Sequence, residues 1–294
     1  MRFEFLGTAG SVPTPRPLCS CEVCCEARTQ GVPHSRNGPA LFVHGPNLLV
    51  DTPEEISSQL NRSSVSRIDG VFLSHWHPDH TMGRRLFELL GKDYIETPPR
   101  HRCTDVFLTP RVIADLKVRL GAWDDLEFYE RGSLVAIHAV EPSSKFKIND
   151  FELMPFSLNE DFAFGLQIRS ATHRALVVPD ETFGWKVPSE LRKPDLAILP
   201  AGVFHIHPVS NLQHLPDSHP MLSREITHQD TLRLIEEIDA DMTILTHIDE
   251  PDRCSYSQLQ KVEALYQRNG KKIAFAYDTM IFDLHSQLRK TSYR

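Results

Sequence analysis

The chain has no apolar run long enough to cross a membrane. A membrane-spanning helix needs about 20 consecutive apolar residues, and no segment of the 294 residues approaches this length. The opening stretch "MRFEFLGTAG" also lacks the long apolar centre of a secretory signal. We therefore expect a cytoplasmic protein with no membrane partner.

The chain also has little positive charge and no basic run. Its 32 lysines and arginines stand against 39 aspartates and glutamates, which gives a net charge of −7. Binding of long nucleic acid needs clustered cations for phosphate contacts, so we expect no such partner. Low-complexity linkers and long internal repeats are missing as well. One domain over residues 1–294 is the simplest organisation, and a homodimeric assembly is left open.

Short apolar segments alternate with helical patterns along the whole chain. This alternation predicts an α/β fold with two strand-rich halves and helices outside. Strands are expected within residues 2–7, 40–51, 70–75, 105–110, 146–158, 164–180, 195–200, 241–247 and 272–284, and helices over 54–60, 81–90, 111–120, 228–238 and 256–268.

The cysteines are concentrated in one short segment near the N-terminus. The chain has six cysteines, and four of them lie in "CSCEVCC" (residues 19–25). Cysteines this close together do not easily pair with one another as disulfides. In a chain without an export signal, such a cluster favours metal ligation.

A second cluster of ligand-type side chains occurs in "HWHPDH", which supplies His75, His77, Asp79 and His80. Imidazole nitrogens and carboxylate oxygens suit Zn²⁺, Mn²⁺ and iron. The cluster follows an apolar strand and precedes a helix, at the edge where α/β folds tend to place ligands. The sequence therefore predicts a metal site at this turn.

This motif resembles the His-x-His-x-Asp-His signature of the metallo-β-lactamase superfamily of hydrolases. "FLGTAGSVPTP", "LLVDTPEE" and "AYDTMIF" are similar to further segments of that family, in the expected order. The resemblance implies a four-layer αβ/βα sandwich, with two mixed sheets and helices outside. It also implies that Asp180 of "VVPDET" bridges two metal ions and that His247 of "ILTHID" is the last histidine ligand.

Within the superfamily, "CSCEVCCEAR" resembles the phosphoribosyl cyclic phosphodiesterase branch of phosphonate degradation. Those relatives hold a separate structural zinc on a Cys-x-Cys-x-x-Cys loop, a spacing that Cys19, Cys21 and Cys24 fit. A tetrahedral site needs a fourth ligand. The relatives use a histidine three residues after the last catalytic one. Glu250 occupies that position here, and the candidates for the fourth ligand are Cys25, His34, Glu250 and Cys254.

One expected ligand of the first active-site ion is missing. The family usually has a histidine about twenty residues before the bridging aspartate, and this count from Asp180 arrives at Asn159. An amide oxygen is a weak zinc ligand beside imidazole. We therefore expect looser binding of this ion, or a substitute ligand among Glu160, Asp161, His205, His207, His214 and His219.

A second departure concerns the residue that protonates the leaving oxygen or holds a phosphate. Phosphodiesterase relatives place a histidine just before the penultimate helix, and by count from His247 that position is Glu225. His228 lies three residues further on, and we favour it as the catalytic residue. The alternative is that Thr227 caps the helix and His228 only lies in its first turn.

The sequence thus predicts a hydrolase with one or two active-site ions, Zn²⁺ or Mn²⁺, and a separate structural Zn²⁺ in the cysteine segment. Two ions would activate a bridging water, which Asp79 orients, to attack a small phosphodiester such as a cyclic phosphate. The alternatives are an RNA-end-processing nuclease, a thioester or lactone hydrolase, and a degenerate protein that binds metal without catalysis. The fold alone does not choose among them.

Overall fold

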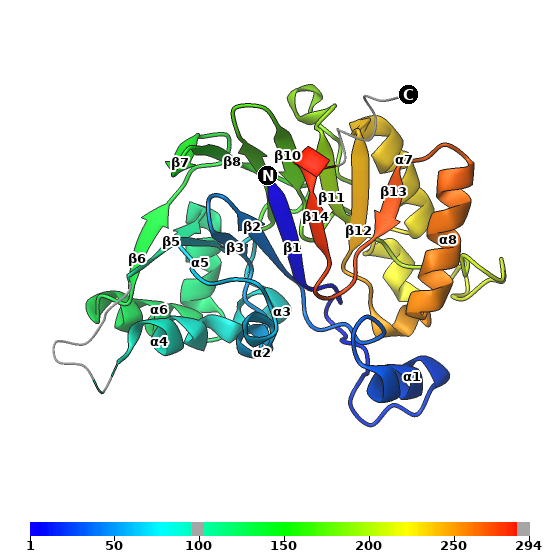
Figure 1. The fold of residues 1–294 in the computed structure, drawn as a ribbon, viewed down its shortest axis with the longest axis horizontal. Helices are drawn as coiled ribbons and strands as arrows, with labels where there is room; N and C mark the ends of the chain where they lie inside the picture. Colours follow the sequence, from blue (N-terminus) through cyan, green and yellow to red (C-terminus); the bar gives the residue numbers. More distant parts are fainter. Residues whose placement is uncertain (94, 96–102, 287–294) are drawn as a thin grey trace.

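The computed structural model describes residues 1–93, 95 and 103–286, and builds them around two seven-stranded sheets (Figure 1). The first sheet has the order β14-β1-β2-β3-β4-β5-β6. Pairing is parallel from β3 to β6 and antiparallel elsewhere. Its strands are β1 (Arg2–Gly7), β2 (Ala40–His44), β3 (Leu48–Val50), β4 (Gly70–Phe72), β5 (Thr104–Leu108), β6 (Val135–Ala139) and β14 (Ile281–Asp283).

The second sheet has the order β13-β12-β11-β10-β9-β8-β7 and is also mixed. Pairing is parallel from β10 to β13 and antiparallel from β7 to β10. Its strands are β7 (Phe146–Ile148), β8 (Phe151–Ser157), β9 (Phe164–Arg169), β10 (Arg174–Val177), β11 (Leu196–Pro200), β12 (Met242–Thr246) and β13 (Ile273–Phe275).

The second sheet is buried on both faces, which explains why its central strands are apolar without interruption. Side chains alternate between the two faces of a strand. In β11, Ile198 packs in the core that joins the two sheets, while its neighbour Leu199 packs in the core under the outer helices. Ile244 and Leu245 divide in the same way in β12. Continuous apolar strands therefore serve two cores.

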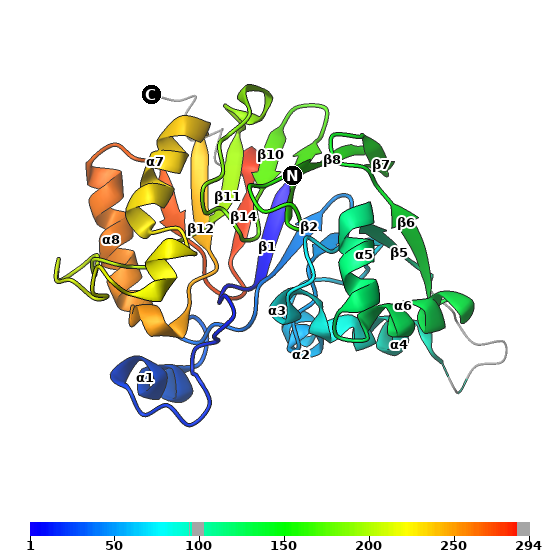
Figure 2. The same ribbon diagram turned by 180° about the vertical axis from the view of Figure 1, so that it is seen from behind.

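Helices cover the outer faces on opposite sides of the molecule (Figures 1 and 2). The first sheet carries α2 (Ile56–Asn61), α4 (Leu86–Gly91), α5 (Pro110–Val118) and α6 (Ala122–Arg131), and the second carries α7 (His228–Ile238) and α8 (Tyr256–Arg268). This arrangement confirms the predicted four-layer sandwich with two mixed sheets and helices outside.

Some local structure differs from the expectation. The helix expected over residues 81–90 is broken into α3 (Pro78–Thr81), a 3₁₀ turn (Met82–Arg85) and α4. The cysteine segment leads into α1 (Glu22–Gln30), a helix that the sequence pattern did not indicate. The same is true of α6 and β6. Among the described residues, no helix is long and apolar enough to cross a membrane.

Candidate metal centre

The histidine cluster begins where β4 ends and is turned by a proline. His77 has extended backbone angles, and Pro78 opens α3 at its first position. Proline suits this position because its fixed φ is helical and its missing N–H would have no helical partner. The chain therefore leaves the extended path between His77 and Asp79. As a result, His75 and His77, before the turn, belong to one group of possible metal ligands, and Asp79 and His80, after it, belong to another.

The first donor group comprises His75, His77, Asp180 and Glu181, whose ligand atoms all lie within 4.8 Å of one another. The His75 Nε2 and His77 Nδ1 atoms are 3.0 Å apart. The Glu181 Oε1 atom lies 3.3 Å from the same His77 nitrogen. Two imidazoles and two carboxylates thus converge on one point, as the ligands of a zinc or manganese ion would.

Glu181 occupies the ligand position in the first donor group that was expected for Asn159 or for a substitute. Its backbone is left-handed, with φ 56°, and turns its side chain to the same side as that of Asp180. The exposed Asn159 instead lies against Gly184. None of the six substitutes named from the sequence belongs to a donor group. For example, Asp161 pairs with Arg111. The only local signal for Glu181 is the pair of adjacent carboxylates in "PDE".

The second donor group comprises Asp79, His80 and His247. The Asp79 Oδ2 atom lies 3.3 Å from His80 Nε2 and 3.8 Å from His247 Nε2. Asp180 reaches this group as well, because its Oδ2 atom is 3.3 Å from His247 Nε2 and 3.9 Å from His80 Nε2. Asp180 therefore lies between the two groups, where the resemblance implies a bridging carboxylate.

Two orphaned nitrogens test whether this site fits a metal. His80 Nε2 and His247 Nε2 are buried without a hydrogen-bond partner, although buried polar atoms are normally satisfied. Each of these nitrogens lies 3.3–3.9 Å from carboxylate oxygens of Asp79 and Asp180. An ion ligated by imidazole and carboxylate would satisfy these nitrogens. The residues present therefore fit a divalent cation.

Asp51 fixes the orientation of two of these histidines from outside the donor groups. Its Oδ2 atom lies 2.7 Å from His80 Nδ1 and accepts a 2.8 Å hydrogen bond from Ser74 Oγ. Ser74 Oγ in turn lies 2.9 Å from His75 Nδ1. A carboxylate behind a ligating imidazole sets which nitrogen is free to bind metal and raises its basicity. Asp51 thus directs Nε2 of His80 towards the donor groups.

The pKa values record the strong negative potential at the second group. Burial disfavours the charged form of His80, but Asp79 and Asp51 outweigh burial and raise its pKa well above the ordinary value. Burial likewise opposes the charge on His247, and Asp180 and Asp79 raise its pKa to about 9. Such a field stabilises a cation. In the first group, burial and then the charge of Asp180 raise the pKa of Glu181 to about 8.

His247 lies in a confined position that a glycine makes available. A Cβ atom on Gly10 would fall 2.4 Å from the His247 ring. His247 itself has a left-handed backbone, with φ 55°. The residues that follow are tied to the N-terminal loop, since Ile248 N donates to Thr8 O (2.9 Å) and Glu250 N donates to Val12 O (3.1 Å). The glycine turn after β1 therefore clamps the segment His247–Glu250.

The other end of this segment completes the cysteine site. Glu250 Oε1 lies 3.3, 3.2 and 3.2 Å from the sulfur atoms of Cys19, Cys21 and Cys24. A tetrahedral zinc ion with bonds of about 2.3 Å to sulfur and about 2.0 Å to oxygen has S···O edges of about 3.5 Å. The four side chains thus fit a closed zinc site. Arg253 Nη1, 2.8 Å from Glu250 Oε1, offsets part of its negative charge.

The remaining candidates for the fourth position lie elsewhere. The exposed Cys25 contacts a backbone carbonyl of its own loop, and His34 pairs with Glu26. The buried Cys254 contacts His207 at 3.6 Å. The structure therefore brings Glu250, and none of these three, to the cysteines.

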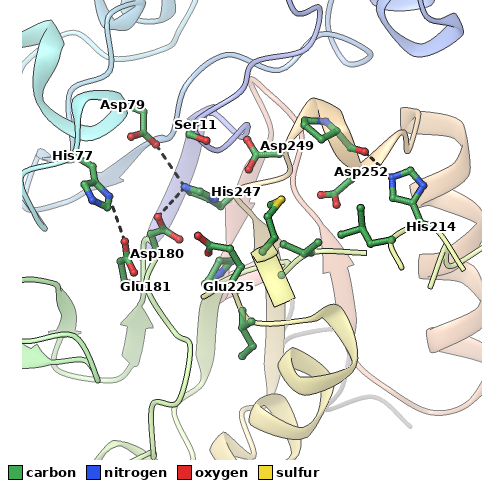
Figure 3. Close-up of a pocket in the computed structure, with 17 residues that line it drawn as sticks. Ser11, His77, Asp79, Asp180, Glu181, His214, Glu225, His247, Asp249 and Asp252 are labelled. Carbon is green, nitrogen blue, oxygen red and sulfur yellow. Dashed lines mark hydrogen bonds and ion pairs between the residues drawn. The ribbon is translucent and has the colours of Figure 1, made fainter. Parts of the chain in front are cut away.

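A cavity of about 220 Å³ opens beside the two donor groups (Figure 3). His77, Asp79, Asp180, Glu181 and His247 line one end. The rest of its lining comes from the last residue of β11, from the irregular segment that follows it, and from the segment after His247: Pro200, Gly202, Val203, His214, Leu215, Met221, Glu225, Ile226, Asp249, Pro251 and Asp252, with Ser11 from the N-terminal loop.

The structure does not bring His228 to this cavity, which corrects the catalytic role expected for it. Thr227 caps α7 through Asp230 N, and His228 is the buried first residue of the helix. Its Nδ1 atom lies 2.7 Å from Ala201 O and its Nε2 atom 2.7 Å from Tyr266 Oη. Burial lowers the pKa of His228 to about 4. Glu225, the alternative by count, lines the cavity. Partial burial, and then the charge of Asp180, raise its pKa.

Several solved structures share this fold. Zn(2+)-bound PqqB from Methylobacterium extorquens is 14% identical, with a TM-score of 0.69 over 96% of this chain and 100% of that one. A diphosphatase of the PhnP family is 21% identical, with a TM-score of 0.68 over 96% and 97%. Human tRNase Z, short form, is 17% identical, with a TM-score of 0.59 over 97% and 99%. At these identities the likeness establishes the fold.

Sequence comparisons give the family. One curated relative, an octanoyltransferase of Porphyromonas gingivalis (strain ATCC BAA-308 / W83), is 25% identical over 161 residues. That match covers 54% of this chain but only 30% of the relative, so this chain corresponds to less than a third of that protein. A family model described as the beta-lactamase superfamily domain matches residues 46–248. Because this match spans most of the chain and includes both donor groups, the protein belongs to the beta-lactamase superfamily.

Proposed function

We propose that the protein is a metal-dependent hydrolase that cleaves a small phosphodiester. One observation carries the proposal: two donor groups meet at Asp180 on the wall of one cavity. Divalent ions held there would lower the pKa of a bound water and offset the charge that develops on phosphoryl oxygens. The imidazole and carboxylate donors suit zinc or manganese, and the cysteine site suits zinc.

The chain's own residues hold and orient the reactants. Asp51 and Ser74 fix the ring orientations of His80 and His75, so that the donor atoms are organised before substrate arrives. Asp79 lines the cavity, where its carboxylate can accept a hydrogen bond from the attacking water and orient it. The apolar side chains of Leu215 and Met221 also line the cavity.

The cavity supports a small substrate over a long RNA. Its volume of about 220 Å³ lies below the range of roughly 300–1,000 Å³ that is usual for ligand pockets. Among the described residues that line it, none is lysine or arginine. Successive RNA phosphates would need such cations. We therefore rank the RNA-end-processing alternative below the small phosphodiester.

Thioester or lactone hydrolysis remains a second candidate, favoured by the placement of His228. A phosphate-binding histidine was expected beside the ions, and the structure turns this side chain away from the cavity towards Ala201 and Tyr266. A neutral acyl substrate does not need that residue.

The proposal is tested on protein purified without added metal. Elemental analysis should find up to three equivalents of transition metal, one of them zinc in the cysteine site. Hydrolysis of bis(4-nitrophenyl) phosphate should be lost in His77→Ala and retained in Cys25→Ser, the exposed control. Unchanged turnover in His77→Ala refutes the assignment. Rapid cleavage of a short acyl thioester, with no cleavage of the diester, favours the second candidate.

A further inference from the structure

The ligand set of the cysteine site carries more negative charge than one zinc ion can offset. Metal ligands bind in their deprotonated forms, so Cys19, Cys21 and Cys24 contribute three negative charges and Glu250 a fourth. Against the two positive charges of zinc, a net charge of −2 remains, whereas a neutral imidazole in place of the carboxylate would leave −1. Cys24 and Glu250 are buried, and surplus charge is costly where water is excluded.

Arg253 supplies the additional positive charge. Its Nη1 atom lies 2.8 Å from Glu250 Oε1 and 3.7 Å from Cys19 Sγ. Among the described residues, no other lysine or arginine forms an ion pair with Glu250. With this guanidinium included, the net charge of the zinc-loaded site returns to −1. The pair of Glu250 and Arg253 therefore equals a neutral histidine ligand in net charge.

The backbone bends in a way that brings the two side chains together. Glu250 opens a single 3₁₀ turn (Glu250–Asp252), and side chains three positions apart in such a turn lie on the same side. Arg253 ends the turn with a left-handed backbone, φ 55°, and its N–H donates to Glu250 O (2.9 Å). This conformation is uncommon for residues other than glycine and persists where the surrounding structure holds it. The chain thus keeps an arginine where the backbone alone would favour glycine.

The Glu250 carboxylate is oriented on one side and unsatisfied on the other. Its Oε1 atom accepts a charge-assisted hydrogen bond from Arg253, and such a bond fixes the direction of a ligand. Its Oε2 atom is buried without a hydrogen-bond partner, although buried polar atoms are normally satisfied. A carboxylate held in this way is ready to accept a further cation.

We propose that Arg253 is a positioning residue of the cysteine site, which makes a carboxylate acceptable as the fourth zinc ligand. It neutralises and orients Glu250, so that the two side chains act as one ligand unit of zero net charge. Zinc retention then depends on Arg253 because the ligand is glutamate, and this dependence should vanish when position 250 carries a histidine. The inference concerns the cysteine site and does not depend on the ester that the active site cleaves.

The test uses Co²⁺ as a spectroscopic probe of the cysteine site. Charge transfer from sulfur to cobalt absorbs near-ultraviolet light, and neither active-site donor group contains sulfur, so this absorption reports on the cysteines. Cobalt-loaded protein is titrated with a competing chelator. Arg253→Gln should weaken retention of the ion about tenfold, at the lower end of the usual range for groups behind a ligand, because the guanidinium is partly exposed. Arg253→Lys, which keeps the charge, should recover most of this loss.

Glu250→His separates charge compensation from mere support of the turn. In this background, the further change Arg253→Gln should alter cobalt retention less than about twofold, because a neutral ligand needs no counter-charge. A tenfold loss in both backgrounds would show that Arg253 only supports the turn and would overturn the inference. Unchanged retention in Arg253→Gln alone would overturn it as well.

A matched control comes from another arginine that pairs with a carboxylate three positions away. Arg233 pairs with Asp230 in α7, and Arg233→Gln should leave cobalt retention unchanged. If cobalt-loaded wild type lacks the sulfur-to-cobalt absorption, the thiols bind no metal and the inference is overturned. If the absorption is present but no diester is cleaved, the proposed function fails while the inference stands.

Discussion

The two sites built on the segment His247–Glu250 use their ligands in opposite ways. At the cysteine site, three sulfurs and one carboxylate oxygen converge on a single point, as the four ligands of a complete tetrahedral set would. At the active site, two donor groups share Asp180 and border a cavity. A closed tetrahedral set is typical of structural zinc, whereas an incomplete set leaves room for water or substrate. One short segment thus contributes to a site built for stability and to a site built for chemistry.

Removal of the shared carboxylate should separate the two sites most clearly. Asp180→Asn should lower hydrolysis more than about 1,000-fold, because both donor groups lose a charged ligand. The cysteine site should keep its zinc, so elemental analysis should fall to about one equivalent. Loss of all metal would contradict the separation of the two sites.

The reciprocal change acts on the cysteine site. Cys24→Ser should release that zinc and destabilise the fold by several kcal/mol, because structural zinc binding contributes directly to folding. The melting temperature should fall by about 10 °C or more. Cys25→Ser, in an exposed residue of the same segment, should melt like the wild type. Equal melting of both variants would show that the thiols bind no metal.

His228 is a buried histidine that belongs to neither site. Its pKa of about 4 lies below the ordinary value of about 6.5. Between these values the unfolded chain binds the proton and the folded chain does not. Stability should therefore fall by about 3 kcal/mol as the pH falls from 6.5 to 4.

Denaturant unfolding over this pH range, compared between wild type and His228→Gln, isolates that contribution from other titrating groups. The variant should lose less stability than the wild type on acidification. Parallel curves would mean that His228 is not held in its neutral form.

The smallest effects are expected on the zinc affinity of the first donor group, from changes at Glu181 and Asn159. Glu181→Gln should weaken binding of one active-site ion at least about tenfold, since even groups behind a ligand often contribute this much. Asn159→His should change the affinity less than about twofold, because Asn159 lies against Gly184. Titration with zinc under competing chelator measures both. Tighter zinc binding by Asn159→His would show that a histidine at position 159 can reach the first donor group as a ligand.

The layered fold and most donor residues could be predicted because their signals are local or ordered along the chain. Apolar strands report burial on both faces, and "HWHPDH" holds four donors within six residues. Glu181 could not be found in this way. It is a different ligand type at the end of a different strand, and it reaches the site through a left-handed backbone that the sequence does not show.

The buried position of His228 can be predicted from the helical spacing of the sequence around it. In α7, His228, Thr231, Leu234 and Ile238 form one buried face at helical spacing. This periodicity places the first residue of the helix against the core rather than in the cavity. The choice of Glu250 among four candidate ligands, in contrast, depended on contacts between residues more than two hundred positions apart.

The clamp between the glycine turn and residues 247–250 has a consequence for how this protein can change. His247, a ligand of the active site, stands three positions before Glu250, a ligand of the cysteine site, and the backbone N–H groups of Ile248 and Glu250 are hydrogen-bonded to the N-terminal loop. An insertion or deletion anywhere in that interval would shift one ligand out of register with its partners. The two centres therefore have to be kept, moved or redesigned together, as parts of a single module.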